Sequence, residues 1–211
     1  MAVSVKTYSL WTLTGVKRYL DNSSDTSQDD RLRGIINAVT DRFEMFAQRH
    51  LGWHDFTSAG EIYTGDNNTV LYLRGWPIRS LDSVAIEDES AIDTGNDKVV
   101  RFAKDDAWEG GKLTLVGGRV WSRGVYPRNV TVKYICGYKP VDDALSGNSV
   151  PEDVHLVGHT EIARRFYERD RVREGISSRS FEGESVVYDA PGTLLKETRE
   201  VLAAYRGWPT Q

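Results

Sequence analysis

Hydrophobic periodicity changes twice along this chain of 211 residues, and that change constrains the fold more than any other feature. Near both ends, apolar residues recur every three or four positions, which is the spacing of one helix face. Between the ends, apolar and polar residues alternate in short runs broken by Gly, Pro, Asn and Asp, which is typical of strands and turns. The sequence therefore predicts helices at both ends and strands in the middle.

The helical spacing predicts four helices. They cover residues 12–20, 29–51, 151–174 and 194–205. The second helix carries the longest apolar stripe, which includes Ile36 and Phe43. Thr12 suits the N-cap of the first helix because its hydroxyl can accept from an unpaired amide one turn later. Pro151 suits the first position of the third helix, where no amide hydrogen is needed.

Strands are predicted between residues 55 and 138, with a turn at Trp76-Pro77. They cover residues 69–73, 81–86, 98–102, 112–116 and 130–138. In the last strand, every second residue from Val130 to Tyr138 points to one face. Cys136 lies on that face, so we interpret it as a small core residue rather than a nucleophile. A single cysteine also excludes an internal disulfide framework and a multi-cysteine zinc site.

Together these elements predict an α+β protein, a small bundle of about four helices with a large β-rich insertion between helices two and three. Residues 1–54 are the first part of the helical domain, residues 55–149 the insertion, and residues 150–211 the second helical part. Within the last part, residues 176–192 are rich in Ser and Gly, which predicts a flexible loop before the C-terminal helix.

The sequence contains few groups that could do chemistry. His155 and His159 are four apart on a predicted helix, but Leu156 stands where a zincin motif needs glutamate, and no third ligand follows at a recognisable spacing. We therefore predict packed or interfacial histidines and no metal. The glycine pairs match no nucleotide-binding loop, and no serine sits in a GxSxG elbow. The sequence predicts no catalytic residue, no cofactor and no enzyme.

Charge and hydropathy narrow the class of protein further. The formal net charge is −4, which argues against a dedicated duplex-DNA binder because such proteins usually present a strongly basic face. No apolar run is long enough to span a membrane, and the N-terminus lacks a signal-peptide pattern, which predicts synthesis in the cytoplasm. The charged run 164–173 is interpreted as a solvated, salt-bridged face, beside which Glu161 and Arg165 are spaced for an i,i+4 pair.

Several stretches, taken in order, resemble the head–tail connector (adaptor or head-completion) family of long-tailed bacteriophages. They are residues 12–20, 71–84, 130–138, 150–154, 166–169 and 202–206. The most telling is Leu71-Tyr72-Leu73-Arg74-Gly75-Trp76-Pro77-Ile78-Arg79-Ser80-Leu81-Asp82-Ser83-Val84, which is similar to the family's strand, Pro-Ile turn and next strand. The chain departs from shorter members in its larger middle, residues 87–126, and in the loop 176–192.

The resemblance implies a virion structural protein made in the bacterial host cytoplasm and located in the neck. It implies a ring of twelve copies beneath the portal protein, a central channel through which DNA passes without sequence-specific binding, a stopper or tail-completion protein on the other face, and no membrane. Two alternatives stay open. One is another neck or tail ring protein, a stopper or tail terminator. The other is a metal-dependent nucleic-acid-processing enzyme that uses His155 and His159.

Candidate contact residues follow from the same resemblance. Tyr205, Arg206 and Trp208 lie at the C-terminal end and are candidates for portal binding, because aromatic and arginine side chains commonly anchor interfaces. The apolar stripe of the C-terminal helix must be covered, either by helices two and three or by the portal, and the resemblance favours the portal. Candidates for contacts with neighbouring subunits or the tail side are Trp76, Trp108, Trp121 and Tyr126.

Overall fold

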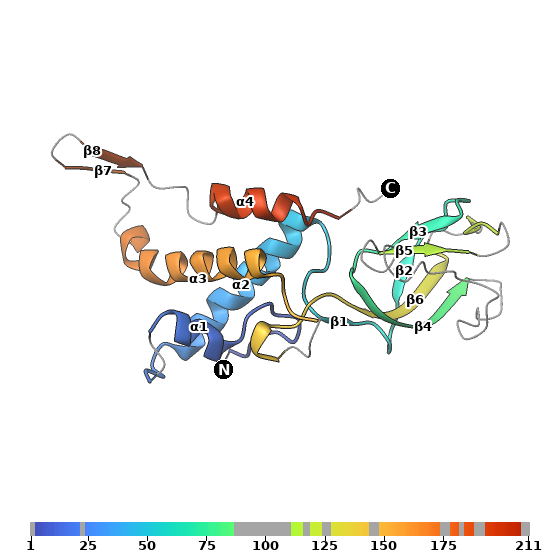
Figure 1. Cartoon of the computed structure of the whole chain (residues 1–211), viewed down its shortest axis with the longest axis horizontal. Coiled ribbons are helices and arrows are strands. Elements are labelled where there is room, and N and C mark those ends of the chain that lie inside the picture. Colours follow the sequence, from blue (N-terminus) through green and yellow to red (C-terminus); the bar gives the residue numbers. More distant parts are fainter. Residues whose placement is uncertain are drawn as a thin grey trace. The chain divides into compact units, whose positions relative to one another are not determined.

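The structure is a computed structural model of the whole chain, and it separates into two compact units. The helical unit is Met1–Ala47 with Pro140–Arg206, and the β unit is Gln48–Lys139 with Gly207–Gln211 (Figure 1). The residues that the structure describes are 3–21, 24–86, 111–115, 119–123, 128–143, 148–173, 178–181, 184–187 and 193–207; between 168 and 192 only backbone is described. Helices and antiparallel sheets confirm the α+β class.

All four predicted helices are present. They are α1 (Leu13–Tyr19), α2 (Asp29–Ala47), α3 (Glu152–Arg173) and α4 (Lys196–Ala203), with a short 3-10 helix at Val141–Asp143. Thr12 caps α1 as predicted, since its hydroxyl accepts from the Gly15 amide at 2.9 Å. The predicted end of α2 at Leu51 is wrong. Gln48 adopts φ 55°, a left-handed conformation that ends the helix after Ala47.

The helical unit is built around α2, which packs against α1, α3 and α4. Ile36 and Phe43 are fully buried, as the apolar stripe predicts. The Trp11 ring meets the Phe43 ring edge-on, with centroids 5.2 Å apart. Trp11 can approach α3 closely because Gly158 has no side chain, and a Cβ there would lie 1.8 Å from the indole. A glycine on α3 therefore admits the largest side chain of this core.

The C-terminal helix α4 folds back within the helical unit, against α2 and α3. Leu194, Thr198 and Leu202 are buried there, and the Tyr205 hydroxyl donates to the Asp153 carboxylate at 2.9 Å. Of the two alternatives for covering the stripe, the structure shows the intrachain one. The apolar face of α4 is therefore not available for a partner.

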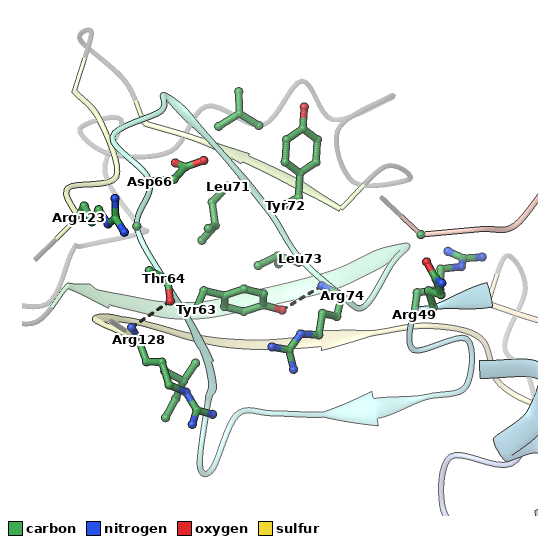
Figure 2. A pocket seen from close by; sticks show the side chains of 15 residues that line it. Arg49, Tyr63, Thr64, Asp66, Leu71, Tyr72, Leu73, Arg74, Arg123 and Arg128 are labelled. Atoms are coloured by element: carbon green, nitrogen blue, oxygen red, sulfur yellow. Dashed lines mark hydrogen bonds between the residues drawn. The ribbon is translucent and has the colours of Figure 1, made fainter. Parts of the chain in front are cut away.

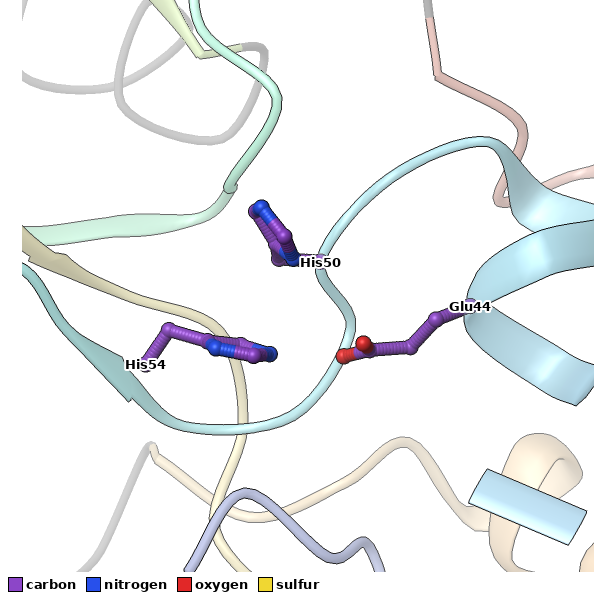
Figure 3. A group of neighbouring side chains, drawn as sticks. All are labelled: Glu44, His50 and His54. Carbon is purple, nitrogen blue, oxygen red and sulfur yellow. The ribbon is translucent and has the colours of Figure 1, made fainter. Parts of the chain in front are cut away.

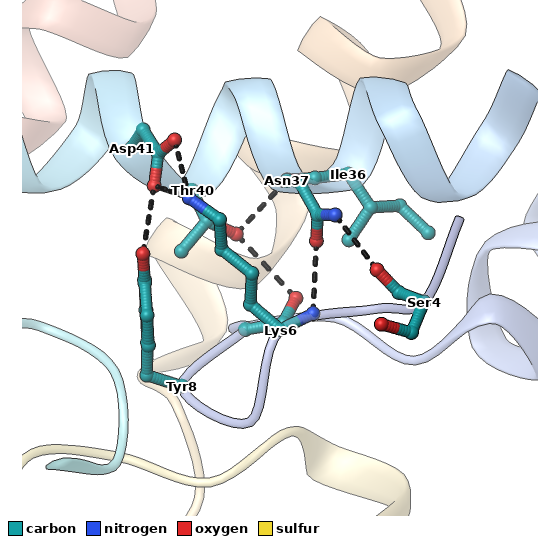
Figure 4. Close-up of polar contacts among 8 residues, drawn as sticks. Ser4, Lys6, Tyr8, Ile36, Asn37, Thr40 and Asp41 are labelled. Atoms are coloured by element: carbon teal, nitrogen blue, oxygen red, sulfur yellow. Dashed lines mark hydrogen bonds and ion pairs between the residues drawn. The ribbon is translucent and has the colours of Figure 1, made fainter. Parts of the chain in front are cut away.

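The N-terminal residues run along α2 and are held by polar contacts (Figure 4). The Asn37 side chain accepts from the Lys6 amide at 3.0 Å and donates to the Ser4 carbonyl at 2.9 Å. The Lys6 ammonium lies 2.7 Å from the Asp41 carboxylate, to which the Tyr8 hydroxyl also donates at 3.2 Å. The hydrogen bond to Asp41 raises the pKa of Lys6. These contacts bind a segment without regular structure to the central helix.

The β unit is organised around one long strand. Its strands are β1 (His54–Asp55), β2 (Glu61–Tyr63), β3 (Val70–Tyr72), β4 (Ile78–Ile86), β5 (Lys112–Thr114) and β6 (Val130–Cys136). β4 pairs along the whole length of β6, so β1 and β2 share the other edge of β6. All these pairings are antiparallel, and β3 pairs with β5 in a separate two-stranded sheet.

The core of the β unit follows the alternation predicted for residues 130–138. Cys136 is fully buried in it, which confirms a packed residue. The Trp121 ring is also fully buried, and its indole N–H lies 3.2 Å from the Thr69 carbonyl. The buried residues of this core are Tyr63, Leu71, Leu73, Ile78, Val84, Ile86, Leu113, Leu115, Trp121, Val130, Val132, Tyr134 and Cys136.

Two features differ from the sequence prediction. Strands β1 and β2 were not predicted. The predicted strand 98–102 lies outside the described residues and stays a prediction. The segment 176–192, predicted as a loop, contains β7 (Ser178–Phe181) and β8 (Glu184–Val187), which pair antiparallel. Phe and Val favour strands, and the surrounding Ser and Gly obscured that signal. No described helix is long and apolar enough to cross a membrane.

Candidate functional site

A cleft of about 770 Å³ lies within the β unit, along β2, β3 and the residues that join them (Figure 2). Its lining is unusual in charge, because the charged residues are four arginines and one aspartate. They are Arg49, Arg74, Arg123, Arg128 and Asp66. In a chain of net charge −4, this concentration of cations makes the cleft the strongest candidate for a binding site among the described residues.

Two of the arginines are exposed, and their backbones are bonded to the turn between β2 and β3. The Arg123 amide donates to the Asn67 side chain at 2.9 Å, and the Arg128 amide donates to the Thr64 hydroxyl at 3.0 Å. Within the described part of the chain, neither guanidinium forms an ion pair. Arg128 also has φ 72°, a left-handed conformation that is uncommon for a residue with a side chain.

The other two arginines contact neighbouring groups. The Arg49 guanidinium is buried over the Trp76 ring, 3.2 Å from its centroid, and donates to the Trp76 carbonyl at 2.8 Å. The Arg74 guanidinium is half-exposed and lies 3.5 Å from the Glu61 carboxylate. Arg49 is thus part of the packing, whereas Arg74 spans the cleft and the buried network beneath it.

That network surrounds the carboxylate of Glu61, a residue only 9% exposed. The hydroxyls of Tyr63 and Tyr134 both donate to it, the second at 2.5 Å, and the His50 ring lies 3.4 Å away. The two hydroxyls in turn accept from the amides of Arg74 and Gly75, at 3.0 and 3.3 Å. The network therefore ties β2 and β6 to the backbone that carries Arg74.

Protonation in this network follows from its contacts. Burial alone would raise the pKa of Glu61, but hydrogen bonds from His50, Tyr134 and Tyr63 outweigh it and lower the pKa. Burial, with the nearby negative charge of Glu61 adding to it, raises the pKa of both tyrosine hydroxyls. At neutral pH the carboxylate is therefore ionised, and both tyrosines are protonated and donate hydrogen bonds to it.

His50 and His54 lie together beside this network (Figure 3). Their ring centroids are 4.3 Å apart, and the His54 ring stacks on Phe56. Glu44, also drawn there, belongs to α2 of the helical unit. Within the described residues of the β unit, no third His, Cys, Asp or Glu places a ligand atom close to both imidazoles. We interpret the pair as aromatic packing around the Glu61 network.

His155 and His159 are packed in the helical unit, as the sequence predicts. Their ring centroids are 4.2 Å apart, and the His159 ring stacks on Tyr19 at 4.7 Å. Burial, with the neighbouring His155 adding to it, lowers the pKa of His159 to about 4. His159 is therefore neutral at pH 7. Among the described residues, no third ligand joins the two rings.

The predicted contact residues fall into three groups. Tyr205 and Arg206 pack within the helical unit, on Asp153 and on the Phe46 ring. Trp76 stacks beneath Arg49, and Trp121 is a core residue, so its ring cannot form an inter-subunit contact as predicted. Trp108, Tyr126 and Trp208 lie outside the described residues.

Sequence reasoning missed the cleft and the carboxylate beneath it. Arg123 and Arg128 stand in an irregular stretch, and nothing in their spacing indicates that both meet the turn after β2. Glu61 and Tyr63 are two apart, which places them on one face of a strand. That spacing is the only local signal of the network, and the glutamate made the strand itself hard to recognise.

Comparisons with known proteins identify the fold. No family model matches the sequence, and no curated protein matches it. The structure is similar to a chain in the neck of a native gene transfer agent (GTA) particle computed with C12 symmetry, with a TM-score of 0.56 at 12% identity over 100% of this chain and 98% of that one. It is also similar to a chain in the neck of an empty GTA particle computed with C6 symmetry, with a TM-score of 0.52 at 12% identity over 93% and 90%.

The chain has the fold of a virion neck protein. The expected resemblance to head–tail connectors is thereby confirmed at the level of the fold, which both units of the chain share with the neck chains. At 12% identity, the similarity assigns no role to an individual side chain.

Proposed function

We propose that this protein is a structural subunit of the neck of a phage-like particle, where it connects the DNA-filled head to the tail. The observation that supports this most is the match over the whole length of both chains with a neck protein, so that neither unit is left without a counterpart. Similarity of fold alone is weak evidence for a chemical activity. It is stronger evidence for a structural role, because a structural protein functions through its shape.

The proposed assembly is a ring of twelve copies around the DNA path. The C12 symmetry of the neck that contains the similar chain supports this number. The net charge of −4 suits a subunit past which DNA slides, because acidic residues that outnumber the basic ones weaken its attraction to phosphates. The proposed partners are copies of this chain, the portal protein, and a stopper or tail-completion protein.

The proposed portal contact is confined to the end of the chain. The apolar stripe of α4 is covered by α2 and α3, so the helix itself does not provide the contact surface. Residues beyond Ala203 remain the candidates, namely Tyr205, Arg206 and Trp208. The hydrogen bond from Tyr205 to Asp153 attaches the residues after α4 to the helical unit, so we assign Tyr205 a structural role. Arg206 and Trp208 are then the proposed anchors for the portal.

The experiment is reconstitution with the portal protein of the same particle. The full-length chain is mixed with purified portal, and complexes are examined by electron microscopy. We expect twelve-fold rings stacked on the portal, and weaker binding by Trp208→Ala, since truncating an interface anchor commonly costs about 2 kcal/mol or more. Met45→Ala, in an exposed position on α2, is the matched control.

Two results would contradict the proposal. Rings that form on tail proteins and never on the portal would indicate a stopper or tail terminator instead. A chain that binds neither set of proteins, but hydrolyses nucleic acid when metal is added, would indicate the enzyme alternative. The second outcome is checked with a His155→Ala, His159→Ala variant.

A further inference from the structure

We propose that the cleft along β2 and β3 binds an acidic peptide segment of a partner protein, one with an aliphatic side chain among its carboxylates. This inference concerns a binding site that the neck role does not specify, and it stands on the geometry of the β unit alone.

Charge identifies the ligand as an anion. Four arginines and one aspartate line the cleft, although the chain as a whole is acidic. Asp66 accepts from the Asn68 amide at 3.0 Å and from the Asn68 side chain, and these bonds orient its carboxylate toward its own turn. The guanidinium groups of Arg123 and Arg128 form no ion pair within the described residues. Guanidinium groups in this state bind carboxylates through paired, charge-assisted hydrogen bonds.

The apolar lining identifies the ligand as a peptide rather than nucleic acid. Ile62 and Tyr72 are 41% and 45% exposed, and both line the cleft together with Val70, Leu71 and Leu73. An aliphatic side chain would cover this surface, whereas a sugar-phosphate backbone offers nothing apolar to place there. Proteins that bind single strands use several aromatic platforms, and duplex binders use a broadly basic face. The cleft matches neither pattern.

The backbone at three of the arginines is held in place before any ligand binds. The amides of Arg123 and Arg128 are bonded to opposite ends of the turn that follows β2, at Asn67 and Thr64. Arg74 is positioned from below, because its amide donates to Tyr63 in the Glu61 network. Figure 2 shows these side chains around the cleft. Groups that are already ordered lose less entropy on binding, which favours a specific contact.

The backbone of Arg128 supports the same conclusion. A residue with a side chain is strained at φ 72°, a conformation that glycine adopts freely. Residues held in such conformations cluster where a ligand is bound, and the inference runs from the observed conformation to the function. An exposed arginine without an ion pair among the described residues contributes little to stability. Its guanidinium is placed where it can pair with a ligand carboxylate.

The test measures binding of a labelled peptide to the full-length protein by fluorescence anisotropy. The probe is a synthetic peptide of about ten residues that contains five carboxylates, one isoleucine and no basic residue. We expect saturable binding that weakens as salt is added. The variant Arg123→Gln, Arg128→Gln should bind about tenfold more weakly, a loss of about 1.4 kcal/mol. A control, Arg18→Gln, Arg199→Gln, removes two exposed cations of the helical unit and should bind as the unchanged protein does.

Two further probes complete the test. A peptide with each acid replaced by its amide should lose binding, and one with isoleucine replaced by serine should bind more weakly. Equal binding of the acidic peptide by the cleft variant and the helical control would overturn the proposal, as would no binding at all. A short DNA duplex that binds more tightly than the peptide, and is lost in the cleft variant alone, would overturn it in favour of nucleic acid. Circular dichroism checks that each variant is folded.

Discussion

Among the residues that the structure describes, each unit buries one glutamate, and the two are held in different ways. In the helical unit, Glu161 is fully buried; its carboxylate lies 3.1 Å from Arg164 and 3.8 Å from Arg165, and accepts from the Leu195 amide at 2.5 Å. In the β unit, Glu61 is held by two tyrosine hydroxyls and by His50, with Arg74 at its edge.

The difference is one of distance along the chain. Arg164 and Arg165 are three and four residues from Glu161 on α3, a spacing that the sequence shows directly. Tyr134 is 73 residues from Glu61 and lies on another strand. The predicted i,i+4 pair of Glu161 with Arg165 is present. The full burial of Glu161 was not predicted, and it arises because α4 begins beside it. Its carboxylate accepts from the amide of Leu195, the N-cap residue of α4. The Leu195 side chain itself forms no capping hydrogen bond. One glutamate therefore acts as a remote helix cap, and the other as the centre of a sheet network.

The largest effects should come from the two cores. Phe43→Ala in the helical unit and Trp121→Ala in the β unit should each lower the free energy of unfolding by about 3–5 kcal/mol, because both rings are fully buried. Urea unfolding followed by circular dichroism measures the change. Met45→Ala, at a side chain 72% exposed, should stay within about 0.5 kcal/mol. A similarly small change for Trp121→Ala would show that its ring is free for a subunit contact after all.

The second effect concerns the two glutamates directly. Glu61→Ala and Glu161→Ala should each cost about 3 kcal/mol, since each leaves buried partners without their acceptor. Glu61→Gln should cost less, about 1 kcal/mol, because the amide oxygen can still accept from both tyrosines. Unfolding free energies at pH 7 test this order. If Glu61→Gln costs as much as Glu61→Ala, charge matters more than hydrogen bonding in the network.

The third effect is a dependence of stability on pH. His159 has a pKa lowered to about 4 from its ordinary value of 6.5, so between these values the unfolded chain binds a proton that the folded chain does not. Stability should therefore fall on acidification, by up to about 1.4 kcal/mol per pH unit. The pKa of His155 is lowered in the same direction by burial. His159→Phe should reduce the slope between pH 6.5 and 4, and an unchanged slope would contradict the assignment.

Glu61 should add to this loss only at lower pH. Its pKa is lowered in the folded chain, so the stability that it contributes is present above the pKa of the unfolded carboxyl and is lost as pH falls through the folded value. Glu61→Gln should therefore flatten the acid limb of the stability curve below about pH 4.5 and leave the slope from His159 unchanged. The two variants thus separate the β unit from the helical unit in one titration.

The smallest effect separates strain from binding. Arg128→Gly should leave the free energy of unfolding unchanged or raise it by up to about 1 kcal/mol, because relief of the left-handed strain is partly offset by the entropy of glycine in the unfolded chain. Asp21→Gly, at φ 52° in the helical unit, is the matched change. Only Arg128→Gly should weaken binding of the acidic peptide. Equal binding by both variants would remove Arg128 from the site.

Elements whose residues interact with near neighbours along the chain could be predicted from the sequence alone. The stripe of Ile36 and Phe43, the Thr12 cap and the alternation from Val130 to Cys136 all depend on a regular backbone period, so they could be predicted without knowledge of the fold. Even there the boundaries depended on context. The helix α2 ends at Ala47 because Gln48 adopts a left-handed conformation. The residue types near that position do not predict where the helix ends.

The binding cleft is formed only in the tertiary structure, by residues that lie far apart in the sequence. In β2, alternation alone would place Ile62 inside and its charged neighbour Glu61 outside, yet the strand has the opposite orientation. It does so because Tyr134, on another strand, supplies a hydrogen bond that makes burial of the carboxylate favourable. Ile62 is then left facing the cleft, beside arginines that lie far from it in the sequence. Such contacts arise from long-range pairing of strands, whose partners have no fixed separation along the chain, and therefore no pattern in the sequence shows them.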